Sequence, residues 1–143
     1  MWIPDINLLL YAHYAGVPEH VRTKAWLDST LDSGETFMLP DLVVTGLVRL
    51  MTHRKILPIP ASADEVIGFV TALRTTPGYL PTVTSSDHID VFARICRASN
   101  ARGDDIPDAY LAAHAIENNA TLCTNDRGFA RFPGLKWMNP LAG

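Results

Sequence analysis

The sequence has few cysteines, no long apolar run and no excess of positive charge. Cys96 and Cys123 have neither a CxxC spacing nor paired histidines, so we expect buried free thiols and not a zinc site. No apolar stretch is long enough to cross a bilayer. The N-terminal apolar run lacks a basic segment and already contains Asp5 and Asn7, unlike a signal peptide. We therefore expect a cytoplasmic protein that does not enter a membrane.

The net charge of −3 argues against broad electrostatic binding of nucleic acid, although a local basic rim around an acidic centre is compatible with it. The composition is that of a folded globular protein, with 48% hydrophobic and 19% charged residues. A chain of 143 residues can form one continuous core, and no repeat or linker divides it. We expect a single domain over residues 1–143.

Strands alternate with helices along the chain. Short apolar runs predict strands at 2–4, 36–40, 80–84, 120–126 and 135–139. Helical spacing and turn residues predict helices at 6–14, 18–33, 41–54, 63–74, 88–99 and 105–119, with one turn of helix near 128–132. This alternation predicts an α/β fold with a mainly parallel sheet.

The histidines show no metal-ligand spacing, so we expect surface or packing roles for His13, His20, His88 and His114. In the helix predicted at 88–99, helical spacing places four apolar residues on the inner face: Ile89, Phe92, Ile95 and Cys96.

Acidic residues stand where predicted strands end. Asp5, Asp41 and Asp126 each follow or end a strand, and Asp108 lies in the first turn of the helix at 105–119. Ligands bind at the carboxyl ends of parallel strands, so these acids are expected to converge. Carboxylates in contact raise one another's pKa, and Mg²⁺ or Mn²⁺ relieves that repulsion. Such an ion suits phosphodiester hydrolysis, because it lowers the pKa of an attacking water and stabilises the leaving oxygen.

Helix capping explains each acid taken singly. Asp5, Asp41 and Asp126 each precede a predicted helix, where a carboxylate accepts hydrogen bonds from free amides. Asp105 and Asp108 flank Pro107 at another helix start, where negative charge is favourable. Capping does not exclude ligation, since one carboxylate can do both. Taken together, the acids favour a metal site.

Three segments resemble the PIN domain family. They are DINLLLYA from Asp5, PDAYLAA around Asp108 and TNDRGFARFP around Asp126. More narrowly, they resemble VapC toxins of bacterial VapBC toxin–antitoxin modules of the mycobacterial type. The stretch DLVVTGLVRLMTHRKI and the closing FPGLKWMNP fit the same group, so the resemblance spans nearly the whole chain.

The resemblance implies a three-layer α/β/α fold and a Mg²⁺-dependent endoribonuclease, with Mn²⁺ as a possible substitute. Asp5 and Asp108 match the family's principal metal-binding aspartates and Asp126 its third acid. It further implies a structured RNA substrate such as transfer or ribosomal RNA, a VapB-type antitoxin and a homodimer. Three residues match polar positions that support the acids: Asn7, Thr124 and Asn125.

One position departs from the family pattern. Many PIN domains carry a glutamate three residues before an arginine in the helix after the second strand. Arg49 matches the arginine, but Gly46 stands in the glutamate position, and Asp41 is the nearest acid that could substitute. The departure leaves the number of metal ions open. It also keeps an alternative open, a catalytically weakened PIN-like module that binds or regulates.

Basic residues cluster at the C-terminal end of the same predicted helix. A cationic helix end is often only solvated and favoured by the helix dipole. Its functional interpretation is a rim that contacts RNA phosphates, formed by Arg49, His53, Arg54 and Lys55, with Arg127 and Arg131 as further members.

Other small α/β classes fit less well. A haloacid dehalogenase-type phosphatase needs an acid two residues after its nucleophilic aspartate, and Asn7 stands there. A response-regulator receiver needs paired acids near the first strand and a lysine after a late strand, and neither is present. Dinucleotide binding needs a glycine-rich turn after the first strand, which is missing.

Overall fold

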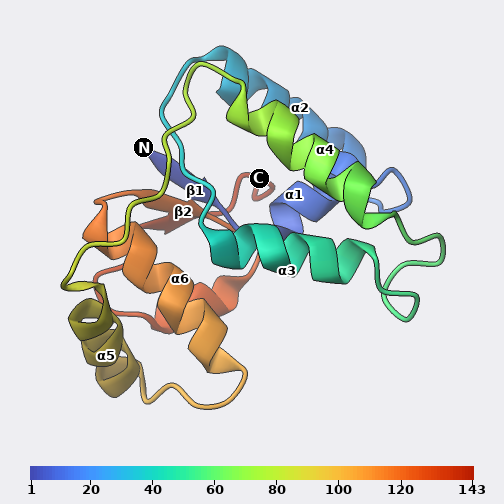
Figure 1. Cartoon of the computed structure of the whole chain (residues 1–143). Helices are drawn as coiled ribbons and strands as arrows, with labels where there is room; N and C mark the ends of the chain where they lie inside the picture. Colours follow the sequence, from blue (N-terminus) through green and yellow to red (C-terminus); the bar gives the residue numbers. More distant parts are fainter.

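The computed structural model describes residues 1–143 (Figure 1). Three short strands form one parallel sheet in the order β1-β2-β3: β1 (Trp2–Pro4), β2 (Thr121–Cys123) and β3 (Trp137–Met138). The predicted α/β class with a parallel sheet is confirmed. No helix is both long enough and apolar enough to cross a membrane.

Six α-helices and one 3-10 helix surround the sheet. They are α1 (Ile6–His13), α2 (His20–Asp32), α3 (Asp41–Met51), α4 (Ala63–Arg74), α5 (His88–Ser99), α6 (Asp105–Glu117) and η1 (Arg127–Arg131). All lie within or close to the predicted spans. Figure 1 shows α5 and α6 together below the strands, with α1 to α4 gathered on the other side. Helix α5 packs mainly on α6, and α3 packs on α1, α4 and α6.

Two predicted strands are absent. Phe37 forms only isolated parallel bridges, to Trp2 on one side and to Tyr79 on the other. Pro40 and Pro81 follow these bridges closely, and a proline has no N–H to continue a ladder. The segments at 36–40 and 80–84 therefore extend the sheet by single contacts and not as strands.

The core brings α6 close to the sheet. Ile3 and Leu122 are fully buried in the central strands, and α6 presents a run of buried small residues, Ala109, Ala112, Ala113 and Ala115. Small side chains allow close approach of a helix backbone, so the first turn of α6 is fixed near the carboxyl ends of β1 and β2. That placement determines the geometry of the candidate site.

Candidate active site

The first acid lies at the joint between β1 and α1. Pro4 pairs with Cys123 in parallel register, and the Asp5 amide donates to the Cys123 carbonyl at 2.8 Å. The residues after β1 and β2 therefore leave the sheet side by side. Asp5 is buried, with 8% of its surface exposed. Its Oδ1 accepts from the Ile6 amide at 2.7 Å, so the predicted cap of α1 is present.

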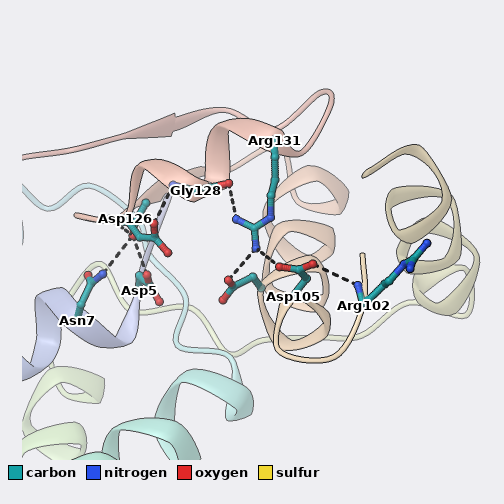
Figure 2. Close-up of polar contacts among 9 residues, drawn as sticks. Asp5, Asn7, Arg102, Asp105, Asp126, Gly128 and Arg131 are labelled. Carbon is teal, nitrogen blue, oxygen red and sulfur yellow. Dashed lines mark hydrogen bonds and ion pairs between the residues drawn. The ribbon is translucent and has the colours of Figure 1, made fainter. Parts of the chain in front are cut away.

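Thr124 orients the site through its hydroxyl group. This fully buried hydroxyl donates to Asp5 Oδ2 at 2.7 Å and accepts from the Asp126 amide at 3.0 Å. It also lies 3.4 Å from Asn7 Nδ2, while Asn7 Oδ1 accepts from the Asn125 amide at 3.4 Å. The residue types that sequence reasoning grouped around the first and third acids thus form one hydrogen-bonded set (Figure 2).

Asp126 begins η1, as its predicted capping role requires. Its Oδ1 accepts from the Gly128 amide at 2.7 Å, and the residue itself is exposed. Figure 2 shows Asp126 beside Asp5, with Asn7 pointing toward the pair. Because capping uses only Oδ1, the other carboxylate oxygen of Asp126 makes no hydrogen bond to the protein.

Asp108 comes to the site from α6 and is paired with an arginine. Arg131 Nη2 lies 3.0 Å from Asp108 Oδ2 and 3.3 Å from Asp105 Oδ1. Arg131 Nη1 also donates to the Gly128 carbonyl, and the guanidinium carbon lies 4.3 Å from the Phe132 ring centre. Sequence reasoning placed Arg131 only in an RNA-binding rim and treated Asp105 as a cap. Both instead belong to the acidic centre (Figure 2).

Burial and neighbouring charges raise the pKa of Asp5 and of Asp108. Burial is the main cause that raises the pKa of Asp5, and the charges of Asp108 and Asp126 raise it further. Burial also raises the pKa of Asp108, against the Arg131 guanidinium, which lowers it. The three carboxylates therefore interact electrostatically, as groups at one rim must.

A cavity of about 270 Å³ opens at this rim. Its lining includes Asp5 and Asp108 together with Thr45, Gly46 and Arg49 of α3. Gly46, which stands where the family pattern predicts a glutamate, therefore lines the same cavity as Asp5 and Asp108. A Cβ atom on Gly46 would lie 2.4 Å from Ile6 Cδ1, so the Ile6 side chain takes the space that a larger residue would need.

Not every candidate residue reaches this cavity. Asp41 lines two other cavities, beside Tyr79 and beside His114, and Pro40 occupies the cap position of α3 without a capping bond from Asp41. Of the cluster of basic residues, only Arg49 lines the cavity. Arg54 and Lys55 are exposed beyond the end of α3, and His53 Nδ1 accepts from the Lys55 amide at 3.1 Å.

The three acids are near one another without forming a closed ligand shell. The one group of His, Cys, Asp or Glu side chains whose ligand atoms all lie within 4.8 Å of one another is elsewhere in the molecule. Arg131 holds Asp108, and Thr124 holds Asp5. Binding of one cation by all three acids therefore requires side-chain rotation at Asp108 or Asp126.

Comparisons with known proteins agree on a family. The family model described as PIN domain matches residues 3–135. Ribonuclease VapC43 from Mycobacterium tuberculosis is 39% identical over 97% of this chain and 95% of the relative. Ribonuclease VapC25 from the same species is 36% identical over 98% of this chain and 99% of the relative.

Solved structures show the same fold. VapBC2 from Rickettsia felis, bound to a promoter DNA fragment, has a TM-score of 0.68 at 19% identity, covering 96% of this chain and 97% of that one. FitAcB from Neisseria gonorrhoeae has a TM-score of 0.66 at 20% identity, covering 98% of both chains. The chain belongs to the PIN domain family, within the group whose named mycobacterial members are VapC ribonucleases.

Proposed function

We propose that this protein is a Mg²⁺-dependent endoribonuclease and the toxin of a VapBC-type toxin–antitoxin pair. Membership of the PIN domain family supports the nuclease class, and relatives named ribonucleases VapC match almost end to end. One observation of the site carries the proposal. Asp5 and Asp108 face one cavity, Asp126 lies beside them, and the charges of Asp108 and Asp126 each raise the pKa of Asp5.

The donor set fits a hard divalent cation. Asp5, Asp108 and Asp126 offer only carboxylate oxygens, which Mg²⁺ and Mn²⁺ prefer, and no sulfur or imidazole lines the cavity. These three residues would hold the ion. When bound, it supplies a lowered pKa for an attacking water and charge stabilisation at the leaving oxygen.

The chain's own residues prepare the site. Thr124 fixes the Asp5 carboxylate through a 2.7 Å hydrogen bond and ties it to the backbone before Asp126. Asn7 and Asn125 brace the same joint. Arg131 lowers the pKa of Asp108 and so favours its charged form. Arg49, at the cavity wall, provides a cation for the RNA phosphate.

The partners follow from the same proposal. The substrate is structured RNA, with transfer and ribosomal RNA as the leading classes, and cleavage takes place in the cytoplasm. The solved neighbours VapBC2 and FitAcB support an antitoxin partner of the VapB type. A homodimer is part of the proposal. His53, Arg54 and Lys55 extend the RNA-binding surface beyond Arg49.

RNA cleavage by the purified, antitoxin-free protein tests the proposal. Total cellular RNA is incubated with the wild type, with Asp5→Asn and with Asp64→Asn, each with Mg²⁺ and with a chelator. Asp64 is an exposed acid in the first turn of α4, outside the cavity, and is the matched control. We expect discrete Mg²⁺-dependent fragments from the wild type and Asp64→Asn, and none from Asp5→Asn.

A folded wild type that leaves all RNA intact would contradict the proposal. That result would favour the catalytically weakened binding module, for which Gly46 in the glutamate position is the supporting observation. Fragments produced equally by Asp5→Asn would place the chemistry at another site.

A further inference from the structure

A second cluster of metal-ligating side chains lies between α5 and α6, outside the acidic cavity. It consists of His88, His114 and Glu117, whose ligand atoms all lie within 4.8 Å of one another. His88 is 1% exposed and His114 is 4% exposed. Buried imidazoles and carboxylates are costly unless they are paired or coordinate a metal, so this cluster requires an explanation.

The fold presents these three groups to one point. His114 and Glu117 are three residues apart in α6, a spacing that puts both side chains on one helix face. His88 is the first residue of α5, which packs on α6. Its Nδ1 lies 2.5 Å from Glu117 Oε2, and the two imidazole ring centres are 4.3 Å apart.

Protein partners leave the cluster incompletely satisfied. Glu117 accepts hydrogen bonds from Ser85 and pairs with His88. His88 Nε2 and His114 Nδ1, by contrast, are buried and have no hydrogen-bond partner. An unpartnered buried polar atom costs roughly 1–3 kcal/mol. His114 Nδ1 therefore lacks a partner that accepts its lone pair, whereas His88 Nε2 lies across the ring from the Nδ1 that meets Glu117 and would not be reached by the same ion.

The cluster also has an access route. A cavity of about 120 Å³ reaches His114 and is otherwise lined by Asp41, Leu42, Thr82, Thr84 and Tyr110. Zinc sites are usually tetrahedral, and a site with three protein ligands leaves one position for water. Of the three cluster residues only His114 lines this cavity, so a water ligand would approach the ion from the His114 side.

We propose that His88, His114 and Glu117 bind one Zn²⁺ ion that fastens α5 to α6, separately from the acidic centre. Two imidazoles and a carboxylate favour zinc over Mg²⁺, which prefers oxygen ligands. Donor atoms around tetrahedral zinc are about 3.3 Å apart, so His88 Nδ1 and Glu117 Oε2, now 2.5 Å apart, must separate to admit the ion. The ion would be structural in effect, because α5 depends on α6 for its packing.

Titration of the full, antitoxin-free chain with ZnCl₂ tests this proposal. Calorimetry gives the affinity and stoichiometry, and thermal unfolding gives the stabilisation. The variants are Glu117→Gln, which keeps the shape of the side chain and removes its charge, and His114→Gln. Asp5→Asn and His53→Gln are the controls, because they remove an acidic-centre carboxylate and a histidine outside the cluster.

We expect one Zn²⁺ per chain, a rise in Tm, and affinity lowered more than about tenfold by either cluster variant. Both controls should bind as the wild type does. The visible spectrum of the Co²⁺ form should show nitrogen and oxygen coordination without thiolate bands from Cys96 or Cys123. Absence of Zn²⁺ binding by the wild type, or undiminished binding by folded Glu117→Gln and His114→Gln, would overturn the proposal.

Discussion

Helix α6 supplies two clusters of very different character. At its start, Asp108 joins Asp5 and Asp126 in a half-open group of like charges, restrained by Thr124 and Arg131. At its end, Glu117 pairs with His88 and lies beside His114 in a largely buried, hydrogen-bonded group. The first group is poorly satisfied because its members repel one another. The second lacks partners only for two imidazole nitrogens.

The acidic centre is suited to catalysis, whereas the histidine cluster is suited to holding α5 against α6. Repelling carboxylates beside a cavity gain from an incoming cation and have space for a substrate. The histidine cluster is enclosed, and its cavity is less than half as large, about 120 Å³ against about 270 Å³. As we propose, catalysis takes place at the start of α6 and structural stabilisation at its end.

Replacing one carboxylate at each end of α6 by the corresponding amide should give the largest and most selective losses, of RNA cleavage at one end and of Zn²⁺ binding at the other. Asp108→Asn is expected to lower RNA cleavage more than about 100-fold, since even groups that only support a metal ligand are worth about 10–100-fold. Glu117→Gln should retain cleavage and lose Zn²⁺ binding. Parallel cleavage and zinc-titration measurements on both variants check this. Equal loss of both properties in both variants would show that the two clusters act as one.

Removing the Thr124 hydroxyl should weaken the acidic centre and the fold together. Thr124→Val keeps the β-branched shape but deletes a buried group that bonds Asp5 and the Asp126 amide. We expect a loss of roughly 1–3 kcal/mol in the free energy of unfolding, measured by denaturant titration, together with reduced cleavage. Thr121→Val, at the first residue of β2, the strand that directly precedes Thr124, is the matched control. A Thr124→Val protein as stable as this control would contradict the orienting role.

Arg131→Gln should shift the pH dependence of cleavage. Burial raises the pKa of Asp108 and Arg131 lowers it, so removal of the guanidinium raises this pKa further. Because the carboxylate must be ionised to hold a cation, the acid limb of the pH–rate profile should move to higher pH. The profile is measured at saturating Mg²⁺, with exposed Arg127→Gln as control. An unchanged acid limb would show that Arg131 does not control the ionisation of Asp108 during cleavage.

Gly46→Ala should have the smallest effect on the free energy of unfolding, because a gain in helix propensity is opposed by a steric clash. Alanine in place of glycine favours the helix by roughly 0.5–1 kcal/mol, while its Cβ would crowd Ile6 Cδ1 at 2.4 Å. We expect a net change within about 1 kcal/mol in the free energy of unfolding. Adding Ile6→Val, which removes Cδ1, should make the double variant more stable than Ile6→Val alone. A double variant less stable than Ile6→Val would show that Ile6 is not the crowding group.

Sequence reasoning located the acidic centre because local rules determine it. The carboxyl ends of adjacent parallel strands must meet, so Asp5 and the residues from Thr124 to Asp126 could be grouped from the order of elements. The capping roles of Asp5 and Asp126 could be predicted as well, because a helix cap depends only on residues that are neighbours in the sequence. Asp108 was grouped with them from its position in the first turn of the helix before the last predicted strands, and the family resemblance then gave it a metal-binding role.

The missed features depend on packing between distant elements. Helical spacing predicted Ile89 on the inner face of α5, yet Ile89 is 64% exposed and His88 is buried against Glu117. No spacing within one segment reveals a pair that joins two helices. The same applies to Arg131, whose contact with Asp108 arises only when η1 folds back over α6. Asp41 fits the strand-end pattern, but it follows a single bridge and faces other cavities.

Thermal unfolding with and without Mg²⁺ tests whether Asp5, Asp108 and Asp126 share one divalent cation, as we propose. Burial raises the pKa of Asp5 above 3.8, so its contribution to stability is present at acid pH and lost as pH rises through the folded-state value. At pH 7 without divalent metal, Asp5→Asn should therefore melt a few degrees above the wild type, and this difference should shrink as the pH falls toward 3.8.

Mg²⁺ should raise the Tm of the wild type and of Asp64→Asn and leave that of Asp5→Asn nearly unchanged, because only the intact acidic centre gains a partner. Equal responses to Mg²⁺ in the wild type and Asp5→Asn, or no response in either, would contradict this proposal.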